Sequence, residues 1–271
     1  MVASSLCFAT MGVFVKLASA ALPFYEVAFF RAFGGGLLAI AGMAIARQPF
    51  KMDRPCVLVW RGVLGWGALT TYFLAISRLP LGDAVLLNYT SPFFTALLAA
   101  AMLGEQLTAR TLGCLAVATA GVACVVGPTG SFLNGGAAAA VLSAFLAAMA
   151  YVTVKRAAAT NEPTVIVVVF SIVASLLSIP PMLWHFTVPV GPQWAWLAAA
   201  AFFGTVAQTL MTYGYRLARA STASVLTLTT PLAAAVLGIL CLGAVPTIGL
   251  VVGGLLILGA GVALSWRDKA P

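Results

Sequence analysis

Charged side chains are scarce in this sequence. Asp, Glu, Lys and Arg make up 7% of its 271 residues, whereas 62% are hydrophobic. An average soluble domain has roughly 25% charged residues. So few charges cannot cover a surface that faces water, which excludes the soluble globular, disordered and disulfide-framework classes. The remaining class is an integral membrane protein built from apolar helices.

Groups that carry out catalysis are equally rare. The one histidine, His185, lies at the end of an apolar segment, so a Ser-His enzyme within the membrane would lack its base. The acids lie in loops or near segment ends: Glu26, Asp53, Asp83, Glu105, Glu162 and Asp268. They provide neither the facing pair of an aspartyl-type intramembrane enzyme nor a midplane carboxylate for proton or sodium coupling. No GxxxxGK[ST] sequence is present, so we expect neither an enzyme nor an ATP-driven pump.

Nothing in the sequence predicts a cofactor, a metal or a nucleic acid as partner. The cysteines form no CxxC pair, and four of the five lie in apolar runs, as packing residues do: Cys7, Cys56, Cys114, Cys124 and Cys241. The formal net charge is +8. The basic residues stand between apolar runs, however, where they mark topology rather than bind nucleic acid.

Ten apolar segments are long enough to cross a membrane as helices, which takes about 20 residues each. Proline, glycine and charged residues separate these segments. The predicted helices cover residues 2–21, 25–46, 57–77, 81–103, 109–126, 136–157, 163–184, 194–216, 220–242 and 247–266.

Lysine and arginine are distributed unevenly between the two sides of these segments. If the N-terminus is cytoplasmic, the inner side has Arg47, Lys51, Arg54, Arg61, Arg110, Lys155, Arg156, Arg216, Arg219, Arg267 and Lys269. The outer side has Lys16 and Arg78, and Arg31 lies within a segment. This bias predicts that both termini are cytoplasmic. Most tryptophans fall near the predicted interfaces, as an aromatic belt requires: Trp60, Trp184, Trp194, Trp196 and Trp266.

The chain repeats itself at an offset of about 139 residues. Ser91-Pro92 matches Thr230-Pro231, and the stretch that ends at Lys16 matches the stretch that ends at Lys155. We therefore predict two five-helix halves, residues 1–130 and 131–271. Because five is odd, the second half enters the membrane from the opposite side. Such an inverted repeat provides two related states, each open to one side, around a midplane site, which favours a transporter.

The stretch Leu103-Gly104-Glu105-Gln106-Leu107-Thr108, followed by Gly113 and Gly121, resembles the end of an EamA-type repeat of the drug/metabolite transporter superfamily. The Ser91-Pro92 and Thr230-Pro231 helices and Arg31 fit the same pattern. The resemblance covers essentially the whole chain, and within the family it comes nearest to YddG-like exporters of aromatic and other neutral amino acids. The second half has Ala244 where the family often has Glu, which weakens a shared coupling role for that Glu.

The resemblance implies an all-α integral membrane protein with ten transmembrane helices, in two inverted five-helix EamA-like repeats. It also implies a central cavity between helices 1–4 and 6–9, and export of small metabolites. We therefore expect a secondary transporter in a bacterial inner membrane, working by alternating access without ATP. Neutral or aromatic amino acids are the first candidate substrates. The alternatives are another substrate class, such as drugs or nucleotide sugars, and a membrane scaffold that transports nothing.

Two prolines near the middle of apolar segments predict helix kinks. Pro92 and Pro231 each remove a backbone hydrogen bond and free the carbonyl four residues earlier, at Asn88 and Thr227. In lipid, a freed carbonyl needs a partner or a wet cavity. Polar residues recur on one face of each segment: Asn88, Ser91 and Thr95 in the first, Ser224, Thr227 and Thr230 in the second. These two faces are candidate walls of a substrate cavity. The alternative is that the kinks are structural and that nearby Ser and Thr hydroxyl groups bond the freed carbonyls.

Three basic residues are candidates for charge attraction or gating. Arg31, inside a predicted helix, would attract a substrate carboxylate or form a buried structural pair. Lys16 and Lys155 occupy equivalent positions in the two halves. Either they extend to the lipid headgroups or they form paired gates at the two mouths.

Aromatic and amide side chains inside the segments complete the predicted substrate site: Trp66, Tyr72, Tyr89, Tyr151, Tyr213 and Gln208. A cavity lined by such groups suits an aromatic or amphipathic substrate, although aromatic residues in membrane helices also serve as packing. Gly249 and Gly253 form a GxxxG pattern, which predicts close helix packing within the chain or at a dimer face. The expected partners are a small-molecule substrate and membrane lipid, and the protein is a monomer or a homodimer.

Overall fold

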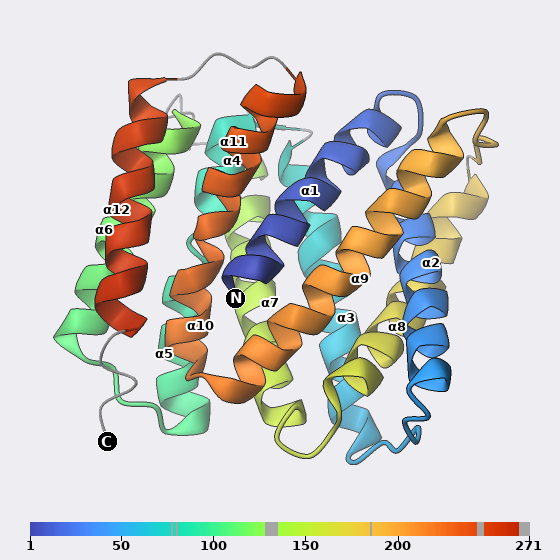
Figure 1. Cartoon of the computed structure of the whole chain (residues 1–271), viewed down its shortest axis with the longest axis horizontal. Coiled ribbons are helices and arrows are strands. Elements are labelled where there is room, and N and C mark those ends of the chain that lie inside the picture. The colour runs from blue at the N-terminus through green and yellow to red at the C-terminus, as the bar shows by residue number, and fades with distance from the viewer. Residues whose placement is uncertain (77, 80, 128–134, 185, 243–246, 266–271) are drawn as a thin grey trace.

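The computed structural model describes residues 1–76, 78–79, 81–127, 135–184, 186–242 and 247–265. Within these ranges every regular element is a helix (Figure 1). The helices are α1 (Val2–Ser19), α2 (Phe24–Ile45), α3 (Pro55–Ile76), α4 (Leu81–Asn88), α5 (Ser91–Leu103), α6 (Ala109–Val126), α7 (Gly135–Ala157), α8 (Pro163–Trp184), α9 (Gln193–Leu217), α10 (Ala220–Thr227), α11 (Thr229–Leu242) and α12 (Ile248–Ser265). His185, Ala244, Trp266, Arg267, Asp268 and Lys269 lie outside the described residues.

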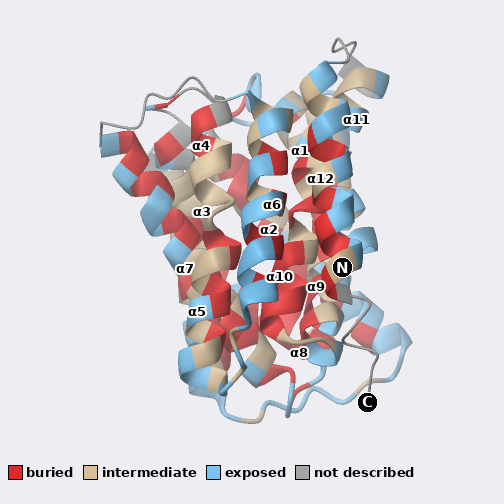
Figure 2. Ribbon diagram, turned by 90° about the vertical axis from the view of Figure 1, so that its left-hand side faces the viewer, coloured by how far each residue is buried: buried red, intermediate tan, exposed pale blue. Residues whose placement is uncertain are grey.

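Among these ranges, eight helical stretches are long and apolar enough to cross a membrane, and Ile248–Leu264 is a shorter apolar helix. The multi-span prediction is thus confirmed, whereas the count of ten stays a prediction. Large apolar side chains face outward along the bundle, as a lipid solvent allows, and small residues fill the interior (Figure 2). Ile45, for example, is 85% exposed, while Ala140 is fully buried.

The helices pair across the two halves of the chain. α6 packs on α12 at one end of the molecule and α2 on α8 at the other (Figure 1). Between these ends, α1 packs on α9 and α3 packs on α7. When the two halves are exchanged, α1 takes the place of α7 and α9 the place of α3, so the α1–α9 pair becomes the α7–α3 pair. The same exchange swaps α6 with α12 and α2 with α8, so each of these two pairs stays the same pair. This exchange is the pattern that an internal two-fold repeat produces.

The repeat extends to individual hydrogen bonds. Ser143 Oγ on α7 donates to the Ala68 carbonyl on α3 over 2.7 Å. Ser4 Oγ on α1 donates to the Ala207 carbonyl on α9 over 2.8 Å. Both members of the second bond are 139 positions from their counterparts in the first. The offset read from the sequence therefore relates equivalent contacts in space.

Two of the predicted helices are broken rather than kinked. α4 ends at Asn88, and α5 begins at Ser91 with Pro92 in its first turn. α10 ends at Thr227, and α11 begins two residues before Pro231. The break replaces a kink because a proline fits best in the first turn of a new helix, where its missing N–H needs no partner.

The hydroxyl groups before the two prolines close the breaks in the same way. Thr90 Oγ1 donates to the Leu87 carbonyl over 2.6 Å, and Thr229 Oγ1 donates to the Leu226 carbonyl over 2.7 Å. These two bonds are again 139 positions apart. They satisfy carbonyl groups that a continuous helix would have bonded.

The predicted GxxxG contact lies within the chain. A Cβ on Gly253 would collide with the Gly121 carbonyl oxygen, and a Cβ on Gly249 would collide with the Cys124 carbonyl oxygen. The two glycines therefore let α12 approach the backbone of α6 closely.

Candidate functional site

The centre of the bundle contains an arginine that the sequence analysis placed with the inner loops. Arg61 lies inside α3 and is 3% exposed, which corrects that assignment. Its guanidinium carbon lies 3.9 Å from the centroid of the Phe170 ring on α8. Its Nη2 donates to Gln208 Oε1 on α9 over 3.3 Å, whereas Nε and Nη1 have no hydrogen-bond partner.

A second arginine lies beside the same residues. Arg31 on α2 is half-buried, and its Nε lies 2.9 Å from the Met11 sulfur on α1, a weak acceptor. Arg31, Phe170 and Gln208 border one small cavity of about 10 Å³. This volume holds about one water molecule. The predicted residues Arg31 and Gln208 thus share a site with Arg61.

Two glycines in equivalent positions make room for the arginines. A Cβ on Gly65 of α3 would lie 2.6 Å from Arg61 Nη1. A Cβ on Gly204 of α9 would lie 3.1 Å from Arg31 Nε. Gly65 and Gly204 are 139 positions apart, so each half of the chain contributes one pocket for a guanidinium group.

No carboxylate among the described residues pairs with either arginine. The ion pairs in this part of the chain are Lys51–Asp53, Arg216–Glu162 and Arg219–Glu105, all away from the site. A charge within the membrane is costly and normally faces a partner or water. Neither guanidinium group has such a partner among the described acids.

Some of the predicted aromatic side chains lie near Arg31 and Arg61, and others do not. Trp66 Nε1 donates to Ser178 Oγ over 3.2 Å, and the Trp66 ring packs beside Phe170. Tyr151 stacks on Tyr215 at 5.4 Å between ring centroids. Three further predicted tyrosines lie elsewhere: half-buried Tyr72 on α3, Tyr89 at the α4–α5 break, and Tyr213, 37% exposed on α9.

The polar residues near the prolines are bonded mainly inside the protein. Asn88 Nδ2 donates to Ser143 Oγ over 2.8 Å, which ties the first break to α7. Thr95, Ser224 and Thr227 donate to carbonyls of their own helices. Ser91 and Pro231 are buried, and Thr230 is half-buried. Local bonds thus account for most of these groups, and their place in a transport pathway stays a prediction.

The two predicted gating lysines have different surroundings. Lys16 is exposed near the end of α1. Lys155 Nζ donates to the carbonyls of Ala218 and Arg216 over 2.6 and 3.4 Å. It therefore caps the C-terminal end of α9, where a cation is favoured by the unpaired carbonyls.

Glu105 of the family-like motif joins the two halves. Its carboxylate accepts hydrogen bonds from the backbone N–H groups of Ala220 and Ser221, over 2.6 and 3.1 Å, and from Ser221 Oγ over 2.8 Å. Arg219 Nε lies 3.9 Å from the same carboxylate. Glu105 thus caps the N-terminus of α10, where a negative charge is stabilised. The sequence singled out the motif but not this partner, which is distant along the chain.

The chain matches the EamA-like transporter family over residues 1–127 and 134–266. It is 35% identical over 275 residues to the Pseudopaline exporter CntI of Pseudomonas aeruginosa PAO1, covering 99% of this chain and 95% of that protein. It is 25% identical over 169 residues to an S-adenosylmethionine uptake transporter of Rickettsia bellii, covering 62% of this chain and 58% of that protein. Neither name is that of an amino-acid exporter.

An uncharacterized transporter of Helicobacter pylori is 25% identical over 231 residues, which cover 78% of this chain and 75% of that protein. A solved crystal structure superposes with a TM-score of 0.82 over 99% of both chains, at 22% identity. At that identity the likeness concerns the fold alone.

Proposed function

Because the chain belongs to the EamA-like transporter family, we propose that it is a secondary carrier that exports small carboxylate-bearing metabolites. It acts in a bacterial inner membrane, with both termini in the cytoplasm. It uses no ATP and works by alternating access. The observation that carries the proposal is the pair of Arg61, which is buried, and Arg31, which is half-buried; neither has an acid partner among the described residues.

The arginine pair defines what the substrate must offer. A carboxylate accepts hydrogen bonds from a guanidinium group, and Arg61 Nε and Nη1 have no hydrogen-bond partner in the protein, so both can donate to a substrate. Phe170 and Trp66 present aromatic surface beside the charge. Neutral and aromatic amino acids satisfy both requirements, and they are the first candidates.

A larger substrate with more than one carboxylate is the second candidate. The site holds two guanidinium groups, and an amino acid has a single α-carboxylate. The relative named Pseudopaline exporter, which matches over nearly the whole chain, supports testing pseudopaline as well. The printed name of that relative also supports the outward direction.

The small volume at the site supports alternating access. A cavity of about 10 Å³ beside Arg31 cannot contain a metabolite. The substrate therefore enters only when helices separate on one side. The two helix breaks, at Thr90 and Leu228, are where each half can bend without losing further backbone hydrogen bonds.

Counterflow in proteoliposomes tests the proposal. Vesicles are preloaded with one unlabelled metabolite, and uptake of the labelled compound is followed with and without a pH gradient. We expect saturable exchange for a few carboxylate-bearing compounds. Arg61→Gln should lower it about tenfold, since a charged hydrogen bond contributes about 1.5–3 kcal/mol. Arg47→Gln, a change in an exposed loop, should leave it unchanged.

Two outcomes would contradict the proposal. Full exchange by folded Arg61→Gln would remove the arginine site from the mechanism. Silence of the folded wild-type protein across amino acids and pseudopaline would favour another substrate class or a scaffold.

A further inference from the structure

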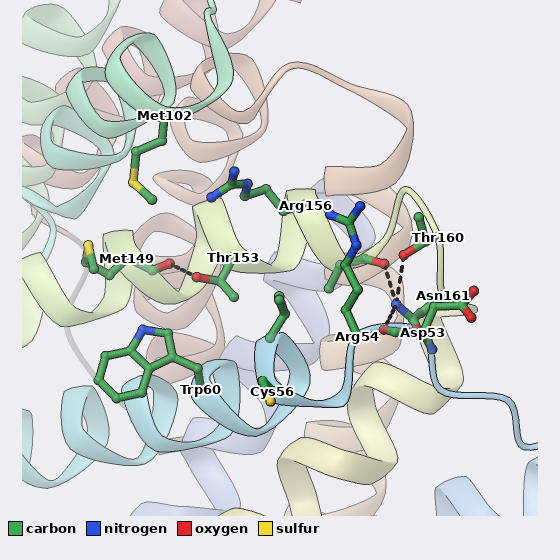
Figure 3. A pocket seen from close by; sticks show the side chains of 12 residues that line it. Asp53, Arg54, Cys56, Trp60, Met102, Met149, Thr153, Arg156, Thr160 and Asn161 are labelled. Carbon is green, nitrogen blue, oxygen red and sulfur yellow. Dashed lines mark hydrogen bonds between the residues drawn. The ribbon is translucent and has the colours of Figure 1, made fainter.

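A groove of about 580 Å³ lies on the outside of the bundle, away from the arginine pair. Its lining comes from the beginning of α3, the end of α5 and the end of α7 with the loop that follows (Figure 3). α3 and α5 both pack on α7, so α7 forms the floor between two walls. Trp60 on one wall is 54% exposed and Met102 on the other is 39% exposed, so the groove is open on the outside of the bundle.

The groove is polar at one end and apolar at the other. Figure 3 shows Arg54 with Asp53, Thr160 and Asn161 at the polar end and Trp60, Met102 and Met149 at the apolar end. Arg156 lies between the two ends, and its guanidinium group points toward Met102. On α7, Met149 and Arg156 are seven residues apart, and therefore lie on one face at a separation of about 10 Å along the axis. The lining of the groove thus changes from polar to apolar along α7, from the loops toward the middle of the bundle.

The groove carries positive charge without a partner. Arg54 and Arg156 are exposed and form no ion pair among the described residues. The acid in the lining, Asp53, lies 4.0 Å from Lys51 instead. Asn161 fixes the Asp53 backbone at both its N–H and its carbonyl, over 2.7 and 3.0 Å, so the loop that presents Arg54 is held in place.

We propose that this groove binds one anionic phospholipid of the leaflet at the arginine-rich end. The phosphate lies between Arg54 and Arg156, and the acyl chain runs along Trp60, Met102 and Met149. Charge complementarity fixes the occupant, because basic pockets between membrane helices recognise anionic headgroups. The open, apolar remainder of the groove is unsuited to a free anion, which would leave that surface without a partner.

Lipid retention by the full-length protein in detergent tests the proposal. Native mass spectrometry counts bound phosphatidylglycerol, with phosphatidylcholine of the same chains and glycerol phosphate as the comparison probes. We expect one phosphatidylglycerol per protein, held about tenfold more tightly than phosphatidylcholine. Glycerol phosphate should bind at least tenfold more weakly, because it lacks the chains.

Matched double variants assign the site. Arg54→Gln with Arg156→Gln should weaken phosphatidylglycerol binding tenfold or more. Arg47→Gln with Arg110→Gln removes the same charge from exposed positions outside the groove and should leave binding unchanged. The melting temperature in lipid-free detergent checks that both variants are folded. Equal binding of phosphatidylcholine, equal binding of glycerol phosphate, or an equal effect of the two double variants would each overturn the proposal.

Discussion

At the scale of single residues, the two central arginines depend on the glycines beside them. Gly65 leaves space for Arg61, and Gly204 leaves space for Arg31. A guanidinium group that binds a carboxylate must keep its plane and position, since the parallel hydrogen bonds of such a pair are directional. The glycines therefore belong to the proposed substrate site although they contribute no side chain to it.

Gly65→Ala should impair transport by displacing Arg61. The added Cβ would lie 2.6 Å from Arg61 Nη1 and 2.9 Å from Phe170 Cε2, so the guanidinium group must shift. We expect counterflow, normalised to the amount of protein, to fall about tenfold, the effect of losing one charged hydrogen bond. Gly67→Ala on the same helix is the control, because its Cβ would make an ordinary 3.4 Å contact. Equal activity of the two variants would show that Arg61 is not positioned by Gly65.

The sequence identified only one of the two arginines. Arg31 lies six residues after the start of its predicted helix, 25–46, and was placed within the span. Arg61 lies four residues after the start of 57–77 and was assigned to an inner loop. Burial depends on neighbours from other helices, and α3 is covered by α7 and α8 there. Phe170 and Gln208 are distant from Arg61 in the sequence, so no local sequence pattern predicts their contacts with Arg61.

At the scale of helices, the breaks at Thr90 and Leu228 give each half a bending point. Pro92 and Pro231 stop the helices from continuing through these points. The sequence predicted a kink at both places, within helices taken as continuous over residues 81–103 and 220–242. It did not separate a kink from a break, because that choice depends on whether the surrounding helices let a new helix begin. Bonds such as Asn88 to Ser143 are of that tertiary kind.

Pro92→Ala and Pro231→Ala should each reduce transport more than expression. Alanine restores the backbone N–H and favours a continuous helix, which removes the bending point. The measurement is counterflow per folded protein, with Pro49→Ala in an exposed loop as the control. Normal counterflow in both variants would contradict a role for the breaks in opening.

The contact between α6 and α12 should be sensitive to one methyl group. Gly253→Ala places a Cβ against the Gly121 carbonyl oxygen and 2.7 Å from Val125 Cγ2, so the helices must separate. Overpacking of this kind costs about 1–3 kcal/mol, and we expect a lower melting temperature in detergent. Gly259→Ala on the same helix meets no atom within 4 Å and should leave the melting temperature unchanged or higher. Similar melting temperatures would mean that the close approach contributes little to stability.

At the scale of the whole molecule, the two-fold internal repeat organises the packing of the helices. Equivalent bonds such as Ser143 to Ala68 and Ser4 to Ala207 relate the halves. The symmetry is incomplete at the arginine site. Arg31 corresponds by offset to Phe170, so one half supplies the charge and the other the aromatic ring beside Arg61. Repeat and fold class were readable from the sequence because they follow from periodic apolar runs.

The most direct test of the central claim compares a carboxylate with its amide in wild-type protein. Counterflow is measured for each exchanged compound that bears a carboxylate, and for the same compound with its carboxylates converted to amides. Because Arg31 and Arg61 lack an acid partner among the described residues, we predict exchange of the carboxylate and at least a tenfold loss for the amide. Equal exchange of both forms would contradict the arginine site and the proposed substrate class.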